Sequence, residues 1–64
     1  MKKETLMYIQ THLSEKEINF FEDEMYRKGI DSQSIISIFF DKETKTVCLV
    51  LEGGKVAEIK IKKV

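Results

Sequence analysis

The chain contains few residues of the types that carry out covalent or metal chemistry. Cys48 is its only cysteine and His12 its only histidine, which excludes an intramolecular disulfide and a metal site built from cysteines or histidines. Cys48 lies in an apolar run between Val47 and Leu49, whereas a reactive thiolate needs a helix N-terminus or a cationic neighbour. We therefore interpret Cys48 as a buried and unreactive thiol.

The residues around His12 do not form a recognisable catalytic motif. No serine, cysteine or pair of acids stands at a motif spacing from it. A glycine-rich phosphate loop is also missing, since Gly53-Gly54 fits a tight turn between strands. We interpret His12 as a surface residue and predict a protein that is not an enzyme and needs no metal or cofactor.

The charged residues form two local groups within a chain of zero formal net charge, in which 11 basic residues balance 11 acidic ones. Acids predominate in residues 15–24, and lysines predominate near the C-terminal end of the sequence. The overall balance argues against sequence-independent nucleic-acid binding, which needs a positive field. Lysines on an edge strand usually discourage aggregation. The alternative is a basic β-ribbon that contacts nucleic acid through Lys55, Lys60, Lys62 and Lys63.

The length of 64 residues predicts a single domain over residues 1–64. A chain this short buries only about 60% of its unfolded surface, so oligomerisation or partner binding is the expected source of extra stability. No apolar run approaches the roughly 20 residues of a membrane span, and none follows Met1-Lys2-Lys3 as in a signal peptide. We expect a cytoplasmic protein, and the abundance of Lys, Ile, Glu and Phe is typical of AT-rich bacterial or phage genomes.

The segment 15–28 carries the signals of both ends of a helix. Ser14 and Glu17 have the spacing of a capping box, in which each side chain accepts a hydrogen bond from the backbone of the other residue. Gly29 stands where a helix C-terminus favours a residue in the left-handed conformation. These signals predict a helix over residues 15–28.

One aromatic residue of this helix lies opposite its apolar stripe. Ile18, Phe21, Met25 and Tyr26 share the stripe, whereas Phe20 points among charged residues. A single exposed apolar residue is common on monomers, but an aromatic ringed by charges is also typical of an interface hot spot. The candidate partner-binding face of the helix therefore consists of Phe20, Asp23, Glu24 and Arg27.

The second half of the chain changes to the period of two that is typical of strands. Residues 35–40, 46–51 and 55–63 are rich in β-branched and aromatic side chains, and Gly53-Gly54 predicts a two-residue hairpin turn. Residues 4–12 fit both a helix and a strand, and their composition favours a strand. We predict an α+β fold with one helix packed on a small antiparallel sheet, in the order β-α-β-β-β, with the first strand left open.

The two central strands are apolar on both faces, unlike strands with one face in water. A two-residue turn would place Leu51 opposite Val56 and Cys48 opposite Ile59. One helix covers one face only, so the N-terminal segment, a second copy of the chain or another protein must cover the other. The candidate dimer or partner face of the sheet comprises Ile35, Phe39, Val47, Leu49, Leu51 and Val56.

Together these features predict a small protein–protein interaction module. The expected form is a homodimeric regulator or inhibitor of a larger intracellular protein of bacterial or phage origin. The alternative is a small nucleic-acid-binding dimer that uses the lysine-rich C-terminal strand.

Overall fold

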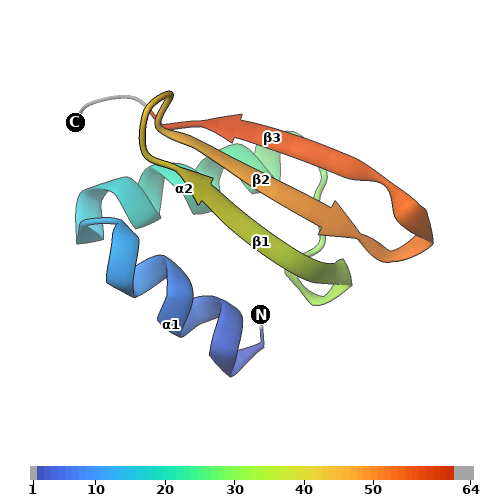
Figure 1. Cartoon of the computed structure of the whole chain (residues 1–64). Helices are drawn as coiled ribbons and strands as arrows, with labels where there is room; N and C mark the ends of the chain where they lie inside the picture. Colours follow the sequence, from blue (N-terminus) through green and yellow to red (C-terminus); the bar gives the residue numbers. More distant parts are fainter. Residues whose placement is uncertain (1, 62–64) are drawn as a thin grey trace.

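The computed structural model describes residues 2–61, in which two helices lie on one side of a three-stranded antiparallel sheet (Figure 1). The helices are α1 (Lys3–His12) and α2 (Glu15–Arg27), and the strands are β1 (Ile35–Asp41), β2 (Thr46–Leu51) and β3 (Val56–Lys60). Short 3₁₀ turns, η1 (Ser32–Ser34) and η2 (Glu52–Gly54), precede β1 and β3. The strands are ordered β1-β2-β3. The predicted α+β class and the predicted meander of three strands are confirmed. Residues 62 and 63, which were predicted for the last strand, lie outside the described residues.

The strand predicted for residues 4–12 is wrong, because this segment forms α1 and the element order is α-α-β-β-β. Thr5, Ile9 and Leu13 are buried at a spacing of four residues, which is the period of one helix face. Burial of this stripe against the sheet outweighs the β-propensity of the individual side chains. The N-terminal segment was one of three expected covers for the second face of the sheet, but α1 lies on the same face as α2 (Figure 1).

The helix predicted for residues 15–28 is confirmed as α2, with both of its ends formed as expected. Tyr26, which was predicted for its buried stripe, is instead exposed. The Ser14 hydroxyl accepts from the Glu17 N–H at 3.2 Å, and the Glu17 carboxylate accepts from the Ser14 N–H at 2.9 Å. At the other end Gly29 has a φ of 70°, and the Ile30 N–H donates to the Met25 carbonyl at 2.9 Å. These bonds satisfy backbone groups that a helix end leaves unpaired.

Glu17 also joins α2 to the sheet. Its Oε2 lies 3.1 Å from Nζ of Lys45, which occupies the β1–β2 turn with a left-handed φ of 52°. The hydrogen bond from the Ser14 backbone, followed by that from Lys45, holds the pKa of Glu17 below its ordinary value of 4.5. The ionised carboxylate is therefore the form that the fold favours.

This lowered pKa predicts a loss of stability in acid. The contribution of the Glu17 carboxylate is present in full above the ordinary pKa of 4.5, and it is lost as the pH falls through the lower pKa of the folded state. Glu17→Gln should lower the melting temperature at neutral pH and flatten its decline in acid. Thermal melts followed by circular dichroism check this, with Glu22→Gln as the control on an exposed position of α2. Parallel pH profiles for all three proteins would contradict the assignment.

The β2–β3 hairpin has a longer loop than the sequence indicated. The Leu51 N–H donates to the Lys55 carbonyl at 2.7 Å, and Val50, not Leu51, pairs with Val56. Both glycines of the loop adopt the expected positive φ, at 85° and 80°. The loop contains three residues, so the predicted two-residue turn is wrong by one position. A shift of one residue moves every β3 side chain to the other face relative to β2.

The shifted register places one apolar face of the sheet under both helices. Leu49 and Ile59 are fully buried there, and Val47 lies directly opposite Ile59. The buried apolar side chains are Ile9, Leu13, Phe21, Met25, Ile35, Phe40, Val47, Leu49, Ile59 and Ile61. Two helices instead of one cover this face, and the other face of the sheet carries no helix (Figure 1).

Candidate functional site

The sheet face turned away from the helices is the candidate site, and we call it the open face. The strand register sets three rows across it: Ser37–Val50–Val56, Phe39–Cys48–Glu58 and Asp41–Thr46–Lys60. Ile36 is the extra residue of a bulge in β1 and is exposed beside the first row. The open face is therefore apolar toward the β2–β3 loop and polar toward the β1–β2 turn.

The apolar half of the open face exposes large side chains from all three strands. The exposed fractions are 60% for Phe39, 68% for Val56, 57% for Ile36 and 39% for Val50. Single exposed apolar residues are ordinary, but a contiguous group with a polar rim marks an interaction surface. This half of the face has the composition of an interface core.

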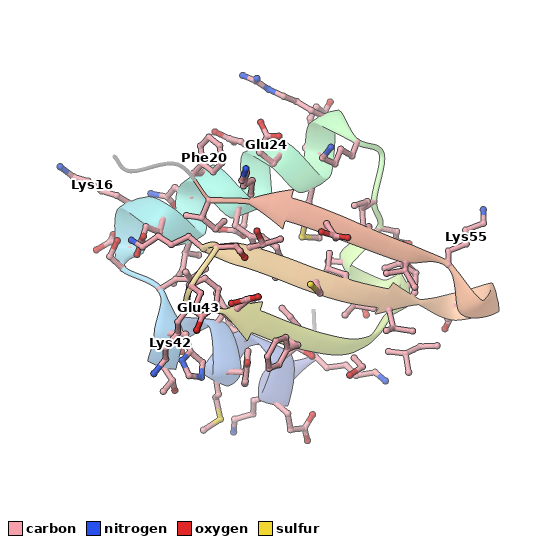
Figure 2. The ribbon with its side chains drawn as sticks, turned by 45° about the horizontal axis from the view of Figure 1, so that its top comes forward. Lys16, Phe20, Glu24, Lys42, Glu43 and Lys55 are labelled. Carbon is pink, nitrogen blue, oxygen red and sulfur yellow. The ribbon has the colours of Figure 1, made fainter. Side chains whose placement is uncertain are left out.

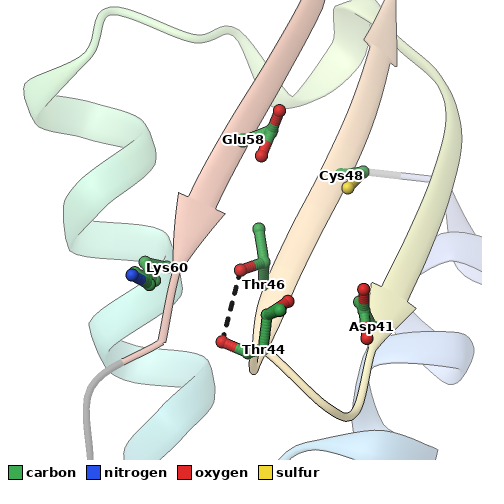
Figure 3. A pocket seen from close by; sticks show the side chains of 6 residues that line it. All are labelled: Asp41, Thr44, Thr46, Cys48, Glu58 and Lys60. Atoms are coloured by element: carbon green, nitrogen blue, oxygen red, sulfur yellow. Dashed lines mark hydrogen bonds between the residues drawn. The ribbon is translucent and has the colours of Figure 1, made fainter.

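The polar half of the open face contains a hollow of about 450 Å³ (Figure 3). It is lined by Asp41, Thr44, Thr46, Cys48, Glu58 and Lys60. The Thr46 hydroxyl donates to the Thr44 carbonyl at 3.3 Å, and the Cys48 side chain is half-buried. The hollow offers carboxylates, hydroxyls and one ammonium group, which are groups that orient a partner. No set of three or more His, Cys, Asp or Glu residues within residues 2–61 is grouped to hold a metal ion.

The single histidine lies away from this hollow. His12 is half-buried, with its ring 4.5 Å from that of Tyr8 and 6.0 Å from that of Phe40. It packs between α1 and β1 instead of standing free on the surface as predicted. His12 and Cys48 thus belong to different surroundings and do not form a pair.

The residues predicted as the partner face of the sheet divide between its two faces, which corrects that prediction. Four of them lie on the helix-covered face: Ile35, Val47, Leu49 and Leu51. Only Phe39 and Val56 lie on the open face, where Val50 joins them. The predicted two-residue turn aligned Val56 with the wrong side of β2. The bulge in β1 inserts an extra residue between Ile35 and Phe39, so Phe39 lies on the opposite face from Ile35.

Phe20 and Glu24 lie on the flank of α2 away from α1 (Figure 2). Asp23 and Arg27, the other helix residues proposed for partner binding, stand three and seven residues after Phe20, a spacing that keeps them near the same side of a helix. Phe20 is half-buried against the core, and Arg27 forms an ion pair with Glu24 at 3.7 Å. Lys16 and Asp23 line a hollow of about 290 Å³ beside Phe20. We call Lys16, Phe20 and Glu24 the α2 flank.

The predicted lysine group is spread out in the described part of the chain. Lys55 follows the η2 loop and Lys60 ends β3, roughly 16 Å further along an extended strand. Lys62 and Lys63 lie outside the described residues. Lys60 stands in the same row as Asp41 and next to Glu58, so its charge is locally balanced.

No known family model, curated protein or solved structure matches this chain. Among residues 2–61, neither helix has the length and apolar character that crossing a bilayer requires.

Proposed function

We propose that this chain is a small, non-enzymatic protein–protein interaction module, which acts as a homodimeric regulator or inhibitor by binding another protein on its open face. The observation that carries the proposal is the exposure of Phe39 and Val56 beside Val50 on three adjacent strands. Burying such apolar area contributes about 25 cal/mol per Å² of favourable free energy, which would stabilise a complex with a partner at this surface.

The two halves of the open face suit a protein surface of matching polarity. An apolar side chain of the partner would contact Phe39 and Val56, and its polar neighbours would reach Asp41, Glu58 and Lys60 in the hollow. Apolar contacts at the centre supply affinity, whereas charges at the rim determine orientation and specificity. Phe39 is the expected hot spot because it is the largest exposed side chain of this face.

Nucleic acid is less suited to the same surface. Phe39 could stack against a base, but Asp41 and Glu58 on either side of the open face repel phosphates. Lys60 alone does not form the positive track that backbone recognition needs.

Replacing Phe39 by aspartate tests the proposal. A partner that the tagged chain retains from a lysate is purified, and its Kd is measured by calorimetry for the native chain and for Phe39→Asp. We expect the Kd to rise by roughly thirtyfold or more, as for the loss of a hot spot. Tyr26→Asp, at an exposed aromatic position on α2, is the matched control and should leave the Kd nearly unchanged.

Salt dependence separates the two classes of partner. Binding through apolar area should change little between low and high salt, whereas binding to phosphates weakens steeply. A partner that binds Phe39→Asp and Tyr26→Asp equally well would contradict the assignment of the open face. Steeply salt-dependent retention of nucleic acid would favour the alternative function.

A further inference from the structure

The two edge strands of the sheet differ in whether a helix covers their outward backbone groups. On β1, the Tyr8 hydroxyl of α1 accepts a hydrogen bond from the Phe40 N–H at 2.9 Å, so a helix covers that edge. No comparable bond to the outward backbone groups of β3 exists among residues 2–61. An edge strand with free N–H and C=O groups is a template for another strand. The β3 edge is thus the one at which the sheet can be extended.

The backbone hydrogen bonds of the hairpin identify which β3 residues face this edge. The Lys55 carbonyl accepts from β2 at 2.7 Å, and the Ile61 N–H donates to the Lys45 carbonyl at 2.8 Å. Backbone groups alternate in direction along an antiparallel strand. Lys55 and Ile61 point toward β2, so the outward groups belong to Val56, Glu58 and Lys60.

We infer that a second copy of this chain adds to the β3 edge in the antiparallel direction, about a two-fold axis at Ile59, to form a continuous six-stranded sheet. In this register Glu58 of each copy lies opposite Lys60 of the other, so the dimer contains two cross-strand pairs of opposite charge. The inference specifies the dimer that the proposed function assumes. Both open faces then lie on the same side of one sheet and form a single larger binding surface.

The charges on β3 favour the axis at Ile59 over axes at the preceding residues. An axis at Glu58 would place this carboxylate opposite its own copy, and like charges directly opposite each other are destabilising. An axis at Ala57 would place Glu58 opposite Val56 and lose both pairs of opposite charge. The axis at Ile59 is the arrangement in which the outward residues of the β3 edge complement themselves.

The α2 flank lies at about the same position along the direction of β3 as Ile59, through which the proposed two-fold axis passes. Glu17 contacts Lys45, and the Lys45 carbonyl accepts from Ile61, so the first turn of α2 lies near Ile61. One helical turn advances about 5.4 Å, and two strand residues advance about 6.6 Å. Phe20 in the next turn therefore lies near the level of Ile59, on the flank of α2 away from α1 (Figure 2).

Two copies of the α2 flank related by this axis are also self-complementary. Lys16 stands four residues before Phe20 and Glu24 stands four residues after it. In an antiparallel helix pair centred on Phe20, Lys16 of each copy meets Glu24 of the other, while the two Phe20 rings meet in the middle. This contact explains why an aromatic side chain stands within a ring of charges on α2. Apolar contacts and strand hydrogen bonds supply the affinity, and the charges select the register.

Charge exchange on β3 tests the dimer by its mass and its dissociation constant. We expect light scattering to give twice the chain mass of 7.5 kDa for the native protein. Glu58→Lys places like charges opposite each other twice and should raise the dimer Kd at least about tenfold. The double variant Glu58→Lys with Lys60→Glu restores opposite charges and should restore the dimer. Glu52→Lys, in the exposed η2 loop, makes the same change of charge away from the edge and should have no effect.

Amide hydrogen exchange gives a second readout that does not depend on mass. The Glu58 and Lys60 amides should exchange slowly in the native dimer and quickly in Glu58→Lys, with the circular dichroism spectrum unchanged. A native monomer would overturn the inference and the homodimeric form of the proposed function, while the effect of Phe39→Asp would still test partner binding on the open face. A dimer that tolerates Glu58→Lys but dissociates in Phe39→Asp would also overturn it and would place the dimer contact on the open face.

Discussion

Leu49→Asp is expected to abolish cooperative folding of this domain. Leu49 is completely buried at the centre of β2, under the two helices. The substitution removes a core side chain, which costs about 2–5 kcal/mol, and it buries a carboxylate with no partner. The whole stability of a small domain is about 5–15 kcal/mol, so the combined loss is comparable to it.

The neighbouring residue supplies the control for this prediction. Val50 follows Leu49 directly but lies on the open face, with 39% of its surface exposed. Val50→Asp should therefore unfold cooperatively in urea near the native midpoint, whereas Leu49→Asp should show no sigmoidal transition by circular dichroism. Equal behaviour of the two variants would mean that the helices do not cover the face assigned to them.

Phe21→Ala is expected to remove about 3–5 kcal/mol of unfolding free energy. Phe21 is completely buried and belongs to the same cluster of core residues as Leu49 and Ile59. Removing its ring would leave a cavity that the helix and sheet can close only in part, because both are held by their own backbone hydrogen bonds. Urea titration of the purified variant measures this loss.

The adjacent Phe20 distinguishes core packing from association. Phe20 is half-buried on the α2 flank, so Phe20→Ala should cost the monomer less than Phe21→Ala. The inferred dimer requires Phe20→Ala to raise the dissociation constant and to weaken the dependence of the melting temperature on protein concentration. Equal losses of unfolding free energy in the two variants would contradict the assigned orientation of α2.

The local sequence determined α2 and the meander. The capping residues Ser14 and Glu17 lie within one turn of each other, and Gly29 acts directly at the helix end. These interactions form between residues close in the chain, so their chemistry can be read without knowledge of the fold. The period of two in β1, β2 and β3 is equally local, since it follows from the pleat of each strand.

The tertiary structure decided the conformation of residues 4–12 and the face of the sheet that is covered. The first segment has the composition of a strand, and only the burial of Ile9 and Leu13 against the sheet selects a helix. The register of the β2–β3 hairpin depends on the length of its loop. Because the loop has a third residue, Cys48 pairs with Glu58 and not with Ile59, the partner predicted from a two-residue turn. Because β2 is apolar on both faces, its sequence could not distinguish the core face from the open face. Packing against α1 and α2 made that choice, because it buries Val47 and Leu49 and leaves Phe39 and Val56 exposed.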